Sequence, residues 1–483
     1  MIEHRLFIAG RWEDGASRRD ILSPYSGKPA ASCHQASAAQ MELALASAAA
    51  SFRDFRRVSR FGRSRLLAAM ARGIESRRAE LVAVIVSEAG KPATLADAEV
   101  SRAVGTFTIA SEEVKRFGGE VIPVDMDSAG RAYSPAVSTW VPKGPVLAIG
   151  PFNFPLNLIA HKVAPALAAG ASVIVKPPPQ APGASRIMAE IFEAAAKEAS
   201  DGRETVPSGA LQVLSAANDV VSAAVTDPRI AVLSFTGSDK VGWMLQGKAA
   251  RKKIVLELGG DAAVIVAEDA DLDRAASRCA FGAFAYAGQV CISVQRVLIQ
   301  KAVFARFTEL FLAATAKISS GDPARPETLV GPLIDSAAAD RVMAWIDEAK
   351  AGGAKVLAGG TRTGNVIAPT VLTGVPATAK LSCDEAFGPV VVLREYAEFD
   401  DALAAVNASR FGLQAGLFTD GAEKIRRAGE ELEVGGLIVN DVPTYRADHL
   451  PYGGVKDSGL GREGVRCAME ECCERRTVVH WRG

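Results

Sequence analysis

From residue 146 onward, short apolar runs alternate with longer segments of helical periodicity. Continuous apolar runs predict buried strands at 146–150, 172–176, 210–214 and 230–235. Segments in which apolar residues recur every three or four positions predict helices at 155–170 and 185–199. This alternation is typical of a parallel sheet covered by helices on both faces, because parallel strands are buried on both sides.

A second series with the same rhythm begins after residue 257. It predicts two helices, near 271–285 and 302–317, and five strands, at 262–266, 297–300, 389–395, 414–418 and 436–440. Residues 40–117 are mostly helical in pattern. The expected fold class is therefore α/β, with two doubly wound Rossmann-like domains whose boundary lies near residue 257.

Two further segments have strand-like patterns outside both series. Residues 131–141 alternate polar and apolar positions as an exposed strand does, and residues 476–481 are rich in strand-forming residues. We expect these segments to form a small additional sheet that pairs subunits.

Composition narrows the possible partners. Basic and acidic residues both number 55, so the net charge is zero and favours neither nucleic acid nor a membrane surface as partner. No secretory signal and no apolar run of spanning length is evident. The seven cysteines are scattered, which favours a reducing cytoplasm and argues against a structural metal site.

Candidate binding residues stand where predicted strands end. Lys176 ends one strand, and Gly237 and Ser238 follow another in "LSFTGSDKVG". Ligands of parallel α/β sheets bind at the carboxyl ends of the strands, so these residues could hold an anion or a cofactor. The alternatives are a solvated lysine and an ordinary turn with Ser238 capping the next helix. "GLGREG" (459–464) has the dinucleotide spacing but lacks a preceding strand, and we reject it as a cofactor loop.

Three residues could carry chemistry. Asn153 in "PFNFPL" could donate to an oxyanion, or could simply form an Asx turn. Glu257 in "IVLELGGD" could be a general base with a raised pKa, or could pair with Lys253. Cys291 in "AYAGQVCISVQRV" could be a nucleophile, although a free cysteine is more often a buried core residue.

Seven stretches, taken together, resemble the aldehyde dehydrogenase superfamily. They occur in the family's order along nearly the whole chain: "PFNFPLNLIAHKVAPALAAG", "SVIVKP", "SFTGS", "LELGG", "GQVCIS", "EAFGPV" and "PYGGVKDSGLGREG". Within that superfamily the chain resembles the branches that act on lactaldehyde, semialdehydes and phosphonoacetaldehyde. The resemblance implies NAD(P)⁺-dependent oxidation of an aldehyde to an acid, through a cysteine thiohemiacetal and a thioester that water hydrolyses.

The resemblance also implies a role for each matching residue. Cys291 would be the nucleophile, Glu257 the base that activates water, and Asn153 an oxyanion donor. NAD or NADP would be bound by residues at the strand ends and in "EAFGPV": Pro151, Phe152, Lys176, Gly237, Ser238, Leu258, Glu385 and Phe387. The implied organisation is a cofactor-binding domain (1–122 and 142–256), a catalytic domain (257–469) and oligomerisation strands (123–141 and 470–483). Family members are usually homodimers or homotetramers.

Two departures from the family pattern bear on specificity. Many NAD-preferring members have a glutamate where this chain has Pro179, so we expect NADP⁺ to be usable. Arg446, Arg102 and His161 fall where the substrate funnel is expected, and an arginine there suits an anionic tail. We therefore expect a small-molecule substrate, a short aldehyde with an anionic or hydroxylated tail.

Two alternatives remain open at this level. One is a CoA-acylating semialdehyde dehydrogenase, although acylating members generally lack the base found here at Glu257. The other is a non-catalytic structural protein on the same fold, although such proteins tend to lose the nucleophile, which this chain keeps as Cys291.

Overall fold

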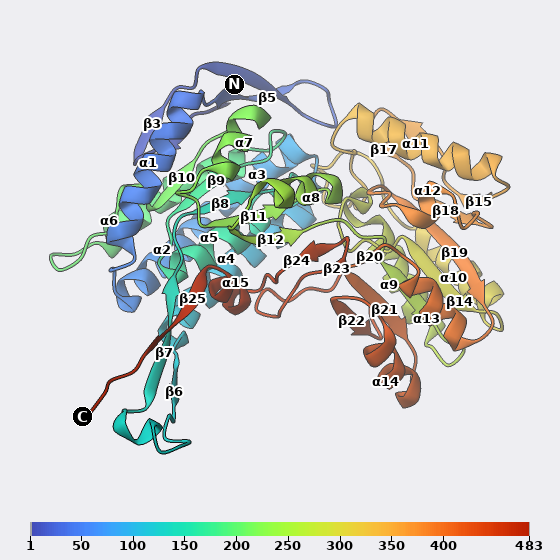
Figure 1. Ribbon diagram of the computed structural model, residues 1–483. Helices are drawn as coiled ribbons and strands as arrows, with labels where there is room; N and C mark the ends of the chain where they lie inside the picture. Colours follow the sequence, from blue (N-terminus) through green and yellow to red (C-terminus); the bar gives the residue numbers. More distant parts are fainter. Residues whose placement is uncertain (1, 483) are drawn as a thin grey trace.

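The computed structural model describes residues 2–482 and contains two large sheets (Figure 1). The first has eight strands in the order β24-β12-β11-β8-β9-β10-β2-β3. Its five central strands are parallel and are β8 (Val146–Ile149), β9 (Val173–Lys176), β10 (Leu211–Val213), β11 (Val232–Thr236) and β12 (Lys253–Glu257). The strands predicted at 146–150, 172–176, 210–214 and 230–235 are thus confirmed to within two residues.

Helices cover both faces of the first sheet, as doubly wound folds require. Alternate residues of one strand point to opposite cores: Val173 and Val175 of β9 lie in one, and Ile174 lies in the other. The first face carries α2 (Arg60–Ser76), α3 (Arg78–Ala89), α4 (Ala93–Arg116), α5 (Asn157–Ala169) and α6 (Gly183–Ala199). The second carries α1 (Ala38–Phe55), α7 (Asn218–Thr226) and α8 (Asp239–Lys248).

The second sheet has seven strands in the order β15-β18-β19-β14-β13-β21-β22. They are β13 (Ala263–Val266), β14 (Arg296–Gln300), β15 (Lys355–Ala358), β18 (Thr370–Thr373), β19 (Val390–Tyr396), β21 (Gln414–Phe418) and β22 (Gly436–Val439). Only β15, at one edge, runs antiparallel to its neighbour. One face packs on α9 (Leu272–Phe284), α10 (Phe304–Thr315) and α11 (Ser336–Ala351), and the other on α13 (Phe399–Asn407) and α14 (Ala422–Glu431). The predicted α/β class with two Rossmann-like layers is confirmed.

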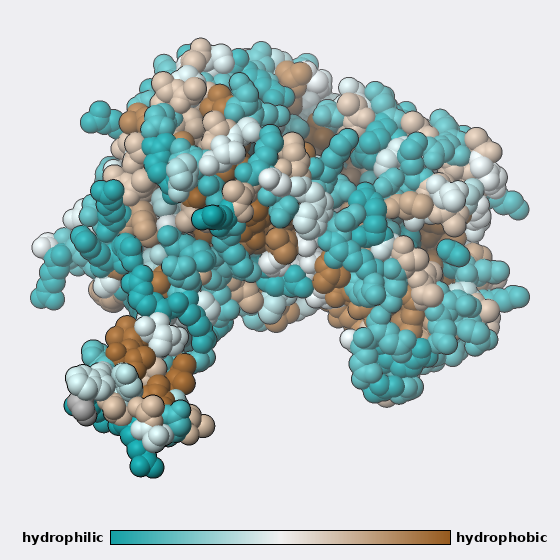
Figure 2. All heavy atoms as spheres, in the orientation of Figure 1, coloured by the Kyte–Doolittle hydropathy of each residue, from teal (hydrophilic) through white to brown (hydrophobic). Residues whose placement is uncertain are grey.

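A narrow three-stranded sheet extends from the body as an arm (Figure 1). It consists of β6 (Glu120–Ile122), β7 (Ala136–Pro142) and β25 (Cys473–Val478), in the order β25-β7-β6. The strand-like patterns at 131–141 and 476–481 therefore correspond to β7 and β25. Exposed apolar side chains gather on the arm, among them Val121, Met126 and Trp481. Figure 2 shows a brown, hydrophobic patch on the arm.

Both ends of the chain contribute small elements that were not predicted. Near the N-terminus, β1 (Ile2–His4), β5 (Pro29–Gln35) and β4 (Ser17–Leu22) form a separate sheet, and β2 (Leu6–Ile8) and β3 (Arg11–Glu13) extend the first large sheet. Towards the C-terminus, β24 (Gly459–Leu460) pairs with β12 and α15 (Val465–Glu471) packs on α5. The chain thus leaves the second sheet and rejoins the first before residue 459, whereas the limit of the catalytic domain was expected at residue 469. The described chain also contains the short pairs β20 (Phe411–Gly412) with β23 (Val455–Lys456) and β16 (Arg362–Thr363) with β17 (Val366–Ile367), the short helix α12 (Lys380–Cys383), and three 3-10 helices, η1 (Gly130–Ala132), η2 (Ser208–Ala210) and η3 (Ala285–Gly288).

Candidate active site

Cys291 lies in the loop that joins α9 to β14. Near its start the loop has three consecutive residues in the left-handed region, Tyr286 (φ 53°), Ala287 (φ 54°) and Gly288 (φ 67°). A Cβ at Gly288 would stand 2.2 Å from the carbonyl oxygen of Gly388, so glycine is required there. The sharp turn brings Sγ of Cys291 to 3.4 Å from the hydroxyl of Tyr452. Burial raises the pKa of the thiol to about 11, and the Tyr452 hydroxyl opposes part of that shift.

Asn153 connects the two layers beside this cysteine. It follows β8, and its Nδ2 donates to the carbonyl oxygen of Gln289, two residues before Cys291, at 2.9 Å. Its own carbonyl accepts from Nζ of Lys91 at 3.0 Å, and Lys91 is paired with Glu99 at 2.7 Å, both fully buried. The Oδ1 atom accepts from the N–H of Phe154, the next residue, which is not the bond of an Asx turn, and the helix α5 that follows has no side-chain cap. The second Nδ2 hydrogen remains available for a substrate oxygen.

Glu257 ends β12 as a buried carboxyl group without a neutralising contact. Both of its oxygens lack a hydrogen-bond partner within residues 2–482. Burial, and then the charge of Glu463, raises its pKa well above the ordinary range. The alternative of an ion pair with Lys253 is wrong, because Nζ of Lys253 binds Glu471 at 2.5 Å.

The expected cofactor residues stand at the carboxyl ends of neighbouring parallel strands. Lys176 ends β9, Leu258 follows β12, and Gly237 and Ser238 follow β11. Ser238 occupies the N-cap position of α8, but its side chain makes none of the cap hydrogen bonds that the sequence suggested. Burial, together with the charge of Arg19, lowers the pKa of Lys176 to about 8.

A second group of these residues faces the cysteine loop. Pro151 and Phe152 follow β8, and the ring of Phe152 meets that of Phe387 edge-on at 5.9 Å. Burial raises the pKa of Glu385 to about 7, and its Oε1 accepts from the N–H of Gly260 at 3.1 Å. A small cavity separates Glu385 and Phe387 from the cysteine loop. A buried amine, a buried carboxyl group and open strand ends fit a ligand with hydroxyl and phosphate groups, as NAD(P) is.

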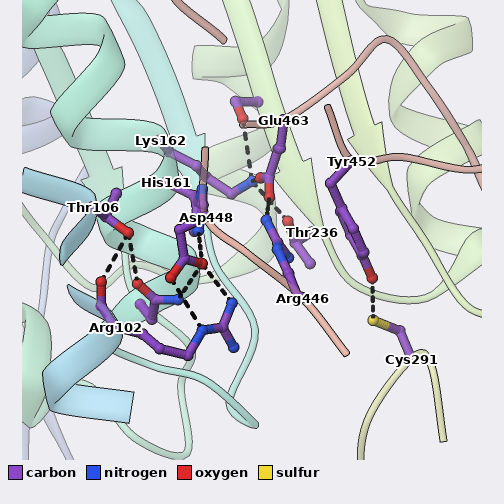
Figure 3. Close-up of polar contacts among 12 residues, drawn as sticks. Arg102, Thr106, His161, Lys162, Thr236, Cys291, Arg446, Asp448, Tyr452 and Glu463 are labelled. Atoms are coloured by element: carbon purple, nitrogen blue, oxygen red, sulfur yellow. Dashed lines mark hydrogen bonds and ion pairs between the residues drawn. The ribbon is translucent and has the colours of Figure 1, made fainter. Parts of the chain in front are cut away.

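Beyond Cys291, a buried network of charged side chains extends from the same centre (Figure 3). Glu463 accepts from Lys162 at 2.9 Å and from Arg446 at 2.9 Å. Burial alone would raise the pKa of Glu463, but these two cations outweigh it and lower the pKa. The guanidinium of Arg446 lies 3.8 Å from the ring centroid of Tyr452, and its Nε has no partner in the described chain.

The remaining expected substrate residues, Arg102 and His161, both face Asp448 (Figure 3). Nη2 of Arg102 and Nε2 of His161 lie 2.6 Å and 2.8 Å from Oδ1 of Asp448. Burial would raise the pKa of Asp448, but these hydrogen bonds hold it well below the ordinary range. Sequence reasoning did not find Asp448, Glu463, Lys162, Tyr452 or Lys91. Glu463 even lies within the "GLGREG" stretch that was rejected as a cofactor loop.

Comparisons with known proteins identify the family of the chain. The aldehyde dehydrogenase family profile matches residues 12–478. A 3-sulfolactaldehyde dehydrogenase of Priestia megaterium is 40% identical over 478 residues, which cover 99% of this chain and 98% of the relative.

Two solved structures show the same architecture. Aldehyde dehydrogenase 21 from Physcomitrella patens, in complex with the reaction product succinate, superposes with a TM-score of 0.96 at 36% identity and covers 100% of this chain and 98% of its own. Glyceraldehyde-3-phosphate dehydrogenase from Methanocaldococcus jannaschii, complexed with NADP, has a TM-score of 0.91 at 36% identity, with coverage of 96% and 98%. By sequence and by structure, the chain belongs to the aldehyde dehydrogenase family.

Proposed function

We propose that this NAD(P)⁺-dependent aldehyde dehydrogenase oxidises a short aldehyde with an anionic or hydroxylated tail, and that Arg446 binds the tail. The position of Arg446 carries the proposal. Its guanidinium stacks on Tyr452, whose hydroxyl lies 3.4 Å from Sγ of Cys291. A short tail on an aldehyde bound to Cys291 would reach this guanidinium. Because the Nε of Arg446 is buried without a partner in the chain described here, an incoming oxygen acceptor would satisfy it.

The names of the relatives support the same substrate class. One is named for 3-sulfolactaldehyde, which combines a sulfonate with a hydroxyl group, and another for lactaldehyde. The structure from Physcomitrella patens was obtained with succinate, a dicarboxylate. All three compounds carry an anionic or hydroxyl group within a few bonds of the reacting carbon.

The geometry supports a division of labour among three residues. Sγ of Cys291 attacks the aldehyde carbon, and the free Nδ2 hydrogen of Asn153 and the backbone N–H of Cys291 donate to the resulting oxyanion. NAD(P)⁺, when bound, supplies the hydride acceptor. Glu257 then takes a proton from water as the water oxygen adds to the thioester carbon. The C–S bond breaks to give the carboxylic acid and the Cys291 thiolate, which can take back the proton held by Glu257.

Retention of Glu257 argues against the CoA-acylating alternative, and retention of Cys291 argues against the non-catalytic one. A CoA-acylating enzyme would lose its thioester to a water activated by this buried carboxylate. A non-catalytic protein would bind NAD(P)⁺ but produce no NAD(P)H with any aldehyde. Assays of an aldehyde with and without CoA separate the three functions. A hydrolytic enzyme forms the acid without CoA, an acylating enzyme needs CoA for turnover, and a non-catalytic protein forms no NAD(P)H in either case.

The decisive test compares a charged and a neutral substrate in Arg446→Gln. We expect kcat/KM for succinate semialdehyde to fall by about thirtyfold more than that for propanal, the scale of a lost charged hydrogen bond. The measurement is NAD(P)H formation with both aldehydes, in the wild type and the variant. An equal loss for the two aldehydes would show that Arg446 serves the fold or the network and does not bind the tail.

We also infer a cytoplasmic homodimer or homotetramer. The arm supports assembly, because an exposed, apolar, narrow sheet is a surface that a second copy would cover. The seven cysteines are all free in the structure, which agrees with a reducing compartment. No helix in residues 2–482 is long and apolar enough to cross a membrane.

A further inference from the structure

Asp448 is a carboxylate in the same network of side chains as Arg446, the residue proposed to bind an anionic tail. It lies in the loop between β22 and Tyr452, and its side chain is 10% exposed. Oδ1 receives Nη2 of Arg102 from α4 at 2.6 Å and lies 2.8 Å from Nε2 of His161 on α5. Nδ2 of Asn157, also on α5, is 3.4 Å away. Two helices thus direct their polar side chains at one oxygen of the loop.

This arrangement divides the basic residues of the site into two groups. Arg102 donates to Asp448 through both Nε and Nη2, so its charge is already matched. Arg446 lies between Tyr452 and Asp448 in Figure 3, and it keeps an unpartnered Nε within residues 2–482. His161 connects the two residues, because it lies within the influence of the Arg446 charge and contacts Asp448, so a tail that reaches Arg446 enters the network that contains this carboxylate.

One more negative charge would neutralise the network. Its cations are Arg102, Lys162 and Arg446, and its carboxylates are Asp448 and Glu463, so the network as a whole carries one positive charge. His161 adds none at neutral pH, because burial and the charge of Arg446 lower its pKa. Glu257 adds none while it is protonated, as its raised pKa favours. Arg462 also acts on Glu257, but it donates to backbone carbonyls outside the network.

We propose that Asp448 is a specificity-determining residue that restricts the site to aldehydes with a singly charged tail, such as a carboxylate or a sulfonate, and disfavours phosphate dianions. The inference rests on the proposed function, in which Arg446 holds the tail. A singly charged tail neutralises the network. A dianion would leave the network, which already holds two carboxylates, with an excess negative charge, and uncompensated like charges in a largely buried site are costly.

The test is Asp448→Asn, which keeps the size of the side chain and removes its charge. The full-length enzyme is assayed at about pH 8, where a phosphate monoester carries about two negative charges. The substrates are glyceraldehyde 3-phosphate, succinate semialdehyde and propanal. We expect the ratio of kcat/KM for the phosphate to that for the semialdehyde to rise by about tenfold over the wild type. An unchanged or smaller ratio would overturn the proposal.

Two further variants make the result specific. Glu112→Gln removes one negative charge from an exposed position of α4, and it should leave the ratio as it is in the wild type. Arg102→Gln removes a cation from the network and should lower the ratio, which provides a test even where Asp448→Asn fails to fold. A rise or no change in Arg102→Gln would contradict the charge argument.

The proposed function and this inference fail in different ways. If the wild type shows no preference for anionic aldehydes over propanal, the proposed function fails and this inference fails with it. If the wild type prefers them, and Asp448→Asn leaves the ratio unchanged, only the role of Asp448 is overturned.

Discussion

At the scale of single residues, the reactive thiol and its base are both held in their neutral forms. Burial raises the pKa of Cys291 to about 11 and that of Glu257 well above the ordinary range. Both groups must lose a proton to act, one as a nucleophile and the other as a base. The resting site therefore protects the sulfur from adventitious reaction and depends on proton removal for activity.

This predicts a rate that increases with pH. For the free enzyme, kcat/KM should climb from about pH 6 to about pH 9 without a plateau, because the deprotonated fraction of a group with a raised pKa grows throughout that range. In Tyr452→Phe the whole profile should shift to higher pH, since the Tyr452 hydroxyl lowers the thiol pKa. Initial rates of NAD(P)H formation across this range give both profiles. A flat profile in the wild type would contradict the prediction.

The residues that sequence reasoning could find are those whose neighbours along the chain are informative. Cys291, Glu257 and Asn153 each stand in a short motif, and the structure places Asn153 against the cysteine loop. Asp448 stands in no such motif, and Glu463 stands in "PYGGVKDSGLGREG" without a neighbour in sequence that indicates its role. Their importance comes from contacts with Arg102 and Lys162, which lie 346 and 301 positions away in sequence. Only the fold brings these charges together.

At the scale of elements, the ends of the parallel strands form the binding surface. Lys176 at the end of β9 lies near the charge of Arg19, which lowers its pKa, and no glutamate follows at Pro179. Lys176 and Arg19 together, without a glutamate at position 179, favour binding of a phosphate group on the ribose of the cofactor.

We therefore predict that the enzyme uses NADP⁺, with kcat/KM for NAD⁺ exceeding that for NADP⁺ by less than about a thousandfold. In Pro179→Glu the preference should move towards NAD⁺, because the new carboxylate would repel a 2′-phosphate and accept a hydroxyl. Steady-state kinetics with both cofactors test this. A thousandfold preference of the wild type for NAD⁺ would refute it.

The large elements were predictable and the small ones were not. Buried parallel strands such as β8 and β13 are continuous apolar runs, so their limits were found to within two residues. The N-terminal strand β4 has a single buried residue, Ile21, and its other five residues are exposed, so no periodic pattern can distinguish it from a loop. The strand β24 is two residues long and exists because β12 lies beside it.

At the scale of the whole molecule, the arm is the exposed apolar feature that most needs a partner. Val121 is 70% exposed and Met126 is 86% exposed, far more than is usual for residues of their type in a folded chain. The chain as a whole carries equal numbers of acidic and basic residues, so no net charge opposes association.

We predict that the double variant Val121→Asp with Met126→Asp assembles less than the wild type. Two carboxylates on the arm would have to be buried against a second copy, and that desolvation is unfavourable. Light scattering after size exclusion should show a smaller mass than for the wild type. The control is Val439→Asp, an exposed apolar residue of β22 away from the arm, whose mass should match that of the wild type. A wild type that is monomeric, or a double variant of unchanged mass, would count against assembly through the arm.

The return of the last residues to the first sheet has a consequence for how the chain is made. The strand β24 borders that sheet, and Val465, Met469, Cys472 and Cys473 belong to its core. The second sheet, by contrast, is built from the continuous stretch between β13 and β22. During synthesis the ribosome therefore releases every residue of the second sheet before it delivers the segment that completes the first. The half that emerges earliest is the last to be finished, so a truncated nascent chain presents an open core to the chaperones that meet it.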